Sequence, residues 1–220
     1  YKTFNTAQDH KRVGEGDKGK NTGGMGAYSP SSLINEELEK KILEKIIDPT
    51  FKAIKEMDDK YIGFLYAGLM IKNNEPFLIE YNVRMGDPEC QTILPLIDND
   101  LVDIIDACCK SKLEKQDIKW KNKKSMCIVL CSKGYPDKYK KDIEIKNLGK
   151  FHSNENNFIF HAGTKKVDDK IYAIGGRVIN FVNISDSFSS SRKEIIKKIE
   201  KLNWENGFYR SDIGYKVIDK

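Results

Sequence analysis

The chain has 220 residues, of which 39% are hydrophobic and 32% charged, and its formal net charge is +5. These proportions are typical of a globular protein and exclude a collagen-like or wholly disordered chain. The longest apolar runs, such as residues 127–131, are much shorter than the roughly 20 residues of a membrane-spanning helix. We therefore expect no membrane partner.

The first half of the chain predicts loops, then helices, then a hairpin. Residues 5–32 are rich in Gly, Asp and Asn and have little periodicity, which indicates long loops. Asn35 is a favourable N-cap for a helix over residues 36–47, and Pro49 interrupts that helix before a second helical segment. The elements expected next are a strand at 61–71, a turn at 72–75, a strand at 76–82, a loop at 83–95 and a helix at 101–113.

The second half of the chain is different in character, with short strands separated by turns. We place the module boundary in the lysine-rich stretch 115–124, which gives predicted domains at 1–115 and 122–220. The expected elements are strands at 125–131, 143–146, 158–161, 171–174 and 177–183, a helix at 187–203 and a last strand at 208–218.

Positive charge is concentrated in residues 110–150, which hold thirteen lysines against five acidic residues. A basic stretch around Trp120 could contact nucleic acid. No arginine is present there to make bidentate contacts with phosphates or guanines. A solvated linker is the favoured interpretation, and we expect no nucleic-acid partner.

Cysteine and histidine patterns indicate neither a disulfide framework nor a zinc site. The five cysteines include no C-x-x-C pair, and His10, His152 and His161 are far apart along the chain. Unpaired cysteines are typical of a reducing compartment, so we expect a cytoplasmic protein.

A first constellation of polar residues ends the strand predicted at 76–82. Glu80 and Asn82 are two residues apart, so a strand places both side chains on one face, and Arg84 follows on the same face if the strand continues. Carboxylate and amide oxygens are hard ligands that suit Mg²⁺, and the Arg84 guanidinium suits a phosphate or carboxylate. The alternative is a polar strand end that faces water.

The loop that follows adds acidic residues beside this face. Gly86 and Pro88 favour a tight turn, and Asp87 and Glu89 bring negative charge that could hold the ammonium group of a substrate. An ordinary acidic turn is the alternative.

A third constellation joins Asp9, Lys11 and Arg12 to a glycine-rich segment. Glycines at this density expose backbone N–H groups that can surround an anion, and the two cations could neutralise the same anion. Glycine clusters also simply make turns. The residues of the segment are Asn21, Thr22, Gly23, Gly24 and Gly26.

A fourth candidate is Arg177, which follows Gly175 and Gly176. Its guanidinium could contact a phosphate, and a hairpin corner with a solvated arginine is equally compatible with the sequence.

Taken together, these segments resemble the phosphoribosylamine–glycine ligase family, also called glycinamide ribonucleotide synthetase. The pattern Arg-x-Gly-Asp-Pro-Glu-x-Gln at 84–91 is similar to that family's signature. Departures such as Lys20, Met85 and Cys90 remove no charged group. Further similar stretches are 7–13, 17–19, 21–30, 63–70, 134–136, 161–164, 175–178 and 210–214.

The resemblance implies an α+β architecture. It consists of the second half of an ATP-grasp domain, an antiparallel sheet with helices, followed by a small mixed α/β C-terminal domain. It also implies ATP-dependent ligation of glycine to 5-phosphoribosylamine through glycyl phosphate, in purine biosynthesis. Glu80 and Asn82 would then bind Mg²⁺ or Mn²⁺, and Lys11 and Arg84 would be catalytic. The implied substrate and phosphate ligands are Asp9, Arg12, Asn21, Thr22, Gly23, Gly24, Gly26, Asp87, Glu89 and Arg177.

The family's domain order adds an expectation about the chain as a whole. Such enzymes carry a nucleotide-binding half before these motifs, so we expect a monomer that works with that N-terminal part and is inactive alone. Two alternatives stay open: an ATP-grasp ligase for a different carboxylate and amine, such as a biotin-carboxylase-like enzyme, and a non-catalytic interaction module.

Overall fold

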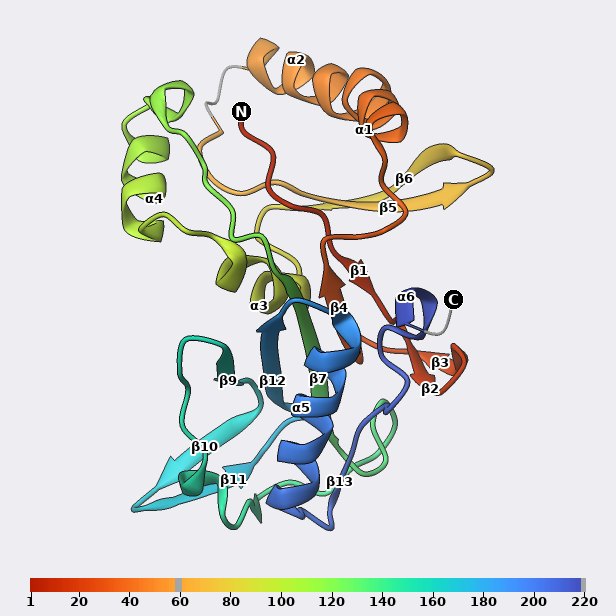
Figure 1. The fold of residues 1–220 in the computed structure, drawn as a ribbon, viewed down its shortest axis with the longest axis vertical. Coiled ribbons are helices and arrows are strands. Elements are labelled where there is room, and N and C mark those ends of the chain that lie inside the picture. Colours follow the sequence, from red (N-terminus) through yellow and green to blue (C-terminus); the bar gives the residue numbers. More distant parts are fainter. Residues whose placement is uncertain (58–60, 219–220) are drawn as a thin grey trace. The chain divides into compact units, whose positions relative to one another are not determined.

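The computed structural model describes residues 1–57 and 61–218 (Figure 1). Its contacts divide the chain into two compact units, each assembled from distant segments. Unit 1 contains Tyr1–Thr3, Ser31–Gly86 and Asn99–Lys119, and unit 2 contains Phe4–Pro30, Asp87–Asp98 and Trp120–Lys220. These units describe packing, and the continuous domains 1–115 and 122–220 stay a prediction.

Helices α1 and α2 of unit 1 form one helical run. The Asn35 side chain accepts a hydrogen bond from the Leu38 N–H at 2.8 Å, which confirms the expected N-cap of α1 (Glu36–Ile42). A π-helical turn, Leu43–Ile47, leads directly into α2 (Asp48–Glu56). The expected interruption at Pro49 was wrong, because the chain is helical on both sides of this proline: the π-helical turn ends at Ile47, and Pro49 lies in the first turn of α2.

The predicted hairpin of unit 1 is confirmed, with a shorter first strand. Strands β5 (Tyr66–Lys72) and β6 (Glu75–Asn82) are antiparallel, and their register shifts between Gly68 and Leu69. At the turn, Asn73 and Asn74 both have left-handed backbones, with φ of 53° and 58°. Helix α4 (Leu101–Cys109) completes the unit, and Asp100 caps its N-terminus.

Unit 2 is organised around a six-stranded antiparallel sheet in the order β1-β4-β7-β12-β9, with β13 pairing with β7. The central strands β7 (Lys124–Ser132) and β12 (Arg177–Ser185) are almost entirely buried. Residues 5–32 had been expected to form loops, but they contribute strands because β4 pairs with β7 about 100 residues later. The other strands of the sheet are β1 (Gln8–Asp9), β4 (Gly26–Ser29), β9 (Asn157–His161) and β13 (Gly207–Phe208).

The remaining elements of unit 2 lie around this sheet. Helix α5 (Phe188–Leu202) packs on β7 and β12 through Ile195, Ile199 and Leu202. Smaller elements are the hairpin β2 (Arg12–Gly14) and β3 (Lys18–Asn21), the sheet of β8 (Ile143–Glu144), β10 (Thr164–Val167) and β11 (Lys170–Ala173), and the short helices α3 (Glu89–Ile93) and α6 (Tyr215–Ile218).

Two predicted segments of unit 2 were wrong. Helix α3 lies in the expected loop 83–95, and its five residues are too few to show a helical period in the sequence. The expected last strand at 208–218 pairs with β7 only through Gly207 and Phe208, and then turns at Gly214, with φ of 82°, into α6. Across residues 1–57 and 61–218, none of the helices combines the length and the apolar character that crossing a membrane requires.

Candidate active site

In unit 1, Glu80 and Asn82 lie at the end of β6, where they pair with Gly68 and Tyr66 of β5. Both follow the bulge and are two residues apart, so they share a face. A Cβ at Gly68 would lie 3.0 Å from the Glu80 Cγ, so the glycine leaves room for this side chain. Arg84 is exposed and donates a 2.8 Å hydrogen bond to the Met85 carbonyl.

The chemistry of these two oxygen ligands fits a hard divalent cation. A carboxylate and an amide oxygen match the one or two protein oxygens that Mg²⁺ commonly takes beside substrate phosphates. No group of three or more His, Cys, Asp or Glu side chains in the described part of the chain could hold a metal by itself. Glu80 and Asn82 would supply two oxygen ligands to such a cation.

In unit 2, the segment from Asp9 to Lys11 alternates its side chains. The Lys11 Nζ lies 2.7 Å from Asp9 Oδ2, while the intervening His10 side chain is fully buried on the other side. This is the period-two alternation of an extended backbone. Lys11 is half exposed and Asp9 is 8% exposed, so the ammonium group of a half-exposed lysine pairs with a buried carboxylate.

Asp9 lies in a confined environment. A Cβ at Gly24 would lie 2.9 Å from Asp9 Oδ1 and 2.5 Å from the Pro88 Cδ. Within the described residues, neither carboxylate oxygen of Asp9 has a hydrogen-bonding partner beyond the Lys11 ion pair. Burial, reinforced by the negative charge of Glu89, raises the pKa of Asp9 to about 6 against the lowering effect of Lys11.

Arg177 connects the glycine-rich segment to the Asp87 loop within unit 2. Its guanidinium donates to the Gly23 carbonyl at 2.8 Å, to the Asp87 carbonyl at 2.7 Å and to Asp87 Oδ2 at 2.9 Å. The Gln91 amide donates to the other Asp87 oxygen at 2.8 Å. Both oxygens of the Asp87 carboxylate are thus engaged. That Arg177 also contacts a phosphate stays a prediction.

The glycines of residues 21–26 permit close packing. The Gly23 N–H donates to the Tyr135 hydroxyl at 2.9 Å, and the Gly24 N–H donates to Thr22 Oγ1 at 3.0 Å. A Cβ at Gly23 would lie 2.9 Å from the Arg177 Cζ, and one at Gly26 would lie 2.5 Å from a β7 carbonyl oxygen. The Thr22 N–H donates to the Lys11 carbonyl at 2.7 Å. At least three of the amides expected to surround an anion therefore have internal partners in this structure.

Asn21 and Arg12 face each other across the β2–β3 hairpin, and Arg12 donates to the Gly19 carbonyl at 2.8 Å. The sequence interpretation did not give roles to Tyr135, Gln91 or His10. Gln91 and His10 stand inside the motifs 84–91 and 7–13, and Tyr135 inside 134–136, so the motifs included these residues without indicating their contacts.

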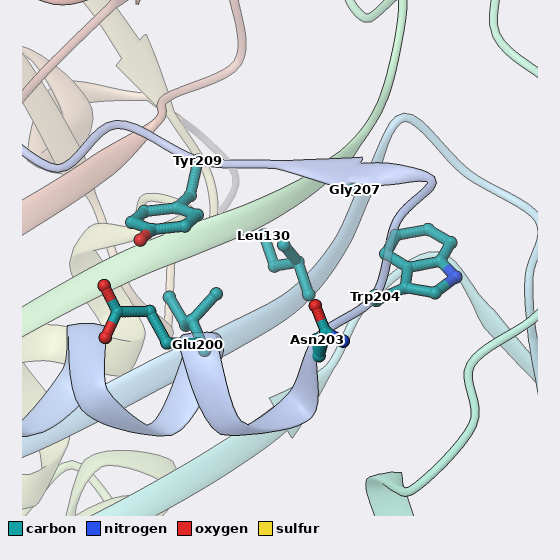
Figure 2. Close-up of a pocket in the computed structure, with 7 residues that line it drawn as sticks. Leu130, Glu200, Asn203, Trp204, Gly207 and Tyr209 are labelled. Carbon is teal, nitrogen blue, oxygen red and sulfur yellow. The ribbon is translucent and has the colours of Figure 1, made fainter.

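A separate pocket of about 150 Å³ lies in unit 2 between the end of α5 and β13, and none of the predicted site residues lines it (Figure 2). Figure 2 shows the Tyr209 hydroxyl and the Glu200 carboxylate on the same side of this pocket. Its lining is Leu130, Ile199, Glu200, Asn203, Trp204, Gly207 and Tyr209.

Comparison with known families accounts for most of the chain. Residues 1–90 match the phosphoribosylglycinamide synthetase ATP-grasp (A) domain, and residues 125–216 match the C domain of the same enzyme. A phosphoribosylamine–glycine ligase from Fusobacterium nucleatum is 41% identical over 212 residues, which cover 96% of this chain and 50% of that protein. The chain belongs to the phosphoribosylamine–glycine ligase family.

Solved structures agree with this family. A crystal structure of phosphoribosylamine–glycine ligase from Thermotoga maritima superposes with a TM-score of 0.83 at 33% identity, covering 96% of this chain and 51% of that one. Biotin carboxylase from Campylobacter jejuni shares the fold, with a TM-score of 0.55 at 15% identity over 78% of this chain and 37% of that one. The expected mixed α/β class with antiparallel sheets is confirmed, and the chain spans about half the length of the ligases it matches.

Proposed function

We propose that this chain carries part of the active site of an ATP-dependent ligase that joins glycine to 5-phosphoribosylamine. A carboxylate oxygen of glycine bonds to the γ-phosphorus of ATP while the bond to the leaving ADP oxygen breaks, which gives glycyl phosphate. The amine nitrogen of phosphoribosylamine then bonds to the acyl carbon, phosphate leaves with its bonding electrons, and the nitrogen loses a proton. The products are glycinamide ribonucleotide, ADP and phosphate.

The observation that carries this proposal is the Asp9 carboxylate. It is buried, and among the described residues neither of its oxygens has a hydrogen-bonding partner beyond the ammonium group of Lys11, which lies 2.7 Å from Oδ2. A substrate ammonium could replace that of Lys11, whose half-exposed side chain would then turn toward a phosphate. We assign the glycine ammonium to Asp9 and the adjacent Glu89, because the Asp87 oxygens are taken by Arg177 and Gln91.

The other candidates share the task of neutralising phosphate charge, which is the main requirement of phosphoryl transfer. Glu80 and Asn82 would hold Mg²⁺ or Mn²⁺, which supplies positive charge to the phosphate oxygens of ATP when bound. Lys11 and Arg84 would act on the transferred phosphoryl group. The remaining proposed contacts to substrate and phosphate are Arg12, Asn21, Thr22, Gly23, Gly24, Gly26 and Arg177, and Asp87 would contribute to this part of the site by holding Arg177.

Substitution of Asp9 in the whole ligase that contains this chain tests the assignment. Asp9→Asn should raise the KM for glycine by on the order of tenfold or more, because it removes a charge-assisted contact, while the KM for ATP changes little. The matched control is Asp186→Asn, since Asp186 is 87% exposed and pairs only with Lys123 in the described structure. An unchanged glycine KM would contradict the role of Asp9.

Substitution of the proposed metal ligands separates the ligase from the alternatives. Glu80→Ala with Asn82→Ala should abolish metal-dependent ADP formation in the whole enzyme. Unchanged turnover with loss of a binding partner would favour an interaction module. Metal-dependent turnover that requires another carboxylate or amine in place of glycine or phosphoribosylamine would favour a different ATP-grasp ligase.

We further propose that the chain acts together with a nucleotide-binding half like that of its relatives, as a monomer in the cytoplasm. Sedimentation of the whole ligase checks the monomer, and a dimer at micromolar concentration would contradict it.

A further inference from the structure

A largely buried network of charged and polar groups lies behind the Asp9–Lys11 segment, and none of its members is among the proposed catalytic and binding residues. We call it the Arg210 network, and it consists of His10, Asp17, Arg210, Asp212 and Lys216. Arg210 is its centre, since this charged side chain is only 1% exposed. A charge that is nearly excluded from water is costly unless it is paired, so its partners are informative.

Arg210 ties the β2–β3 hairpin to the C-terminal segment of unit 2. Its guanidinium donates to Asp17 Oδ1 at 2.8 Å, to the Arg12 carbonyl at 3.0 Å and, in a fork, to the two Asp212 oxygens at 2.8 and 2.7 Å. Asp212 also accepts the Gly16 N–H at 2.8 Å. Segments nearly 200 residues apart are therefore fixed by charge-assisted hydrogen bonds.

His10 extends this network to the candidate site. The Gly214 N–H donates to His10 Nε2 at 3.1 Å, which leaves the ring proton on Nδ1, and Nδ1 lies 3.4 Å from Asp17 Oδ1. The other Asp17 oxygen is 2.6 Å from the Lys216 Nζ. Burial and the charge of Arg210 lower the pKa of His10 to about 4, so the ring is neutral near pH 7.

We propose that the Arg210 network positions the Asp9–Arg12 segment for catalysis, so that its members are positioning residues for the reaction assigned to Asp9 and Lys11. The inference rests on the proposed function. His10 stands between Asp9 and Lys11 in an extended segment, so holding its ring on one side directs both neighbours to the other. The Arg12 carbonyl held by Arg210 anchors the end of the same segment.

The test uses two variants of graded severity and one control. Asp212→Asn removes the charge that Arg210 holds in a fork, and Lys216→Gln removes a 36% exposed partner of Asp17, which a folded protein tolerates more easily. Lys123→Gln breaks a comparable Lys–Asp pair elsewhere in unit 2, 2.7 Å long against 2.6 Å for Lys216 and Asp17. Two readouts are needed: steady-state kinetics of the whole ligase, and the pKa of Asp9 measured by carbon-13 NMR titration of the 220-residue chain.

We expect Asp212→Asn to lower kcat ten- to a hundredfold, as small misplacements of catalytic groups do, with the KM for ATP within about twofold of wild type. Lys216→Gln should cause a smaller loss, and both should shift the pKa of Asp9. Folded variants with wild-type kcat and Asp9 pKa would overturn the proposal, as would a loss of kcat with an unchanged Asp9 pKa. If the wild-type ligase forms no glycine-dependent ADP, the proposed function fails, and the Asp9 titration still decides the network.

Discussion

The β5–β6 hairpin of unit 1 and the six-stranded sheet of unit 2 place their residues in opposite environments. On the hairpin, Phe77, Ile79 and Glu80 are all exposed, and the neighbours that shape it are close in sequence. In unit 2, Phe181 of β12 is 1% exposed and Arg210 is buried with its partners from distant segments. The comparison indicates that the two groups of candidate residues are held differently: Glu80 and Asn82 by a local hairpin, Asp9 and Lys11 by long-range packing.

The largest expected difference is in the free energy of unfolding, between a substitution in the buried sheet of unit 2 and one on the exposed face of the β5–β6 hairpin. Phe181→Ala should lower the free energy of unfolding by about 3–5 kcal/mol, because it removes a buried ring and leaves a cavity. Ile79→Ala on the hairpin should change it by less than about 0.5 kcal/mol, since Ile79 is 65% exposed. Urea denaturation followed by far-ultraviolet circular dichroism measures both. Equal effects would show that the hairpin face is buried in solution.

The same contrast explains how much of the molecule could be predicted from the sequence. The hairpin turn at 72–75 and helix α5 were predictable because their signals are local: turn-forming asparagines and an apolar residue every turn. Strands β1 and β4 were not, because β4 becomes a strand only by pairing with β7 about 100 residues later. The strand propensity of residues 26–29 does not indicate that they pair with β7.

The candidate site shows the same limit. Glu80 and Asn82 could be placed on one face from strand periodicity alone. The motifs also named Asp87 and Arg177, but a bond between residues 90 positions apart has no signal in a single sequence. Nor does the glycine-rich segment reveal that the Gly23 amide is taken by Tyr135. The motifs gave the candidate residues, and the packing of unit 2 determines which of their polar atoms are already engaged by other residues of the unit.

The free energy of unfolding should depend on pH in the buried part of the site, where Asp9 and His10 change it in opposite directions as the pH falls. Below pH 6.5 His10 is protonated in the unfolded chain, whereas the native ring stays neutral down to about pH 4. This group therefore makes the free energy of unfolding fall as the pH falls. Native Asp9 takes up its proton near pH 6 and unfolded Asp9 near 3.8, so this group makes stability rise as pH falls. Each effect reaches at most about 1.4 kcal/mol per pH unit.

Asp9→Asn should remove the second effect and leave the first. Relative to wild type, the variant should be more stable at pH 7.5, and this advantage should shrink steadily as the pH falls from about 6 toward 4. Urea denaturation at half-unit pH intervals measures the difference, with Asp186→Asn as an exposed control that should show no such trend. A difference between Asp9→Asn and wild type that does not change with pH would mean that the native Asp9 carboxyl titrates normally.

The smallest expected change in the free energy of unfolding is at the hairpin turn. It tests whether the β5–β6 hairpin of unit 1 is stabilised by its own turn. Asn74 has a φ of 58°, a left-handed backbone that asparagine and glycine tolerate and alanine disfavours. Asn74→Ala should therefore cost about 0.5–1 kcal/mol of unfolding free energy relative to Asn74→Gly. Both variants lose the same weak 3.4 Å contact from the side-chain amide to Glu37 and keep the backbone carbonyl that accepts from Lys41. An equal stability of the two variants would mean that the left-handed backbone at position 74 does not determine the stability of the hairpin. The face carrying Glu80 and Asn82 would then depend on packing beyond the turn, as the residues of unit 2 do.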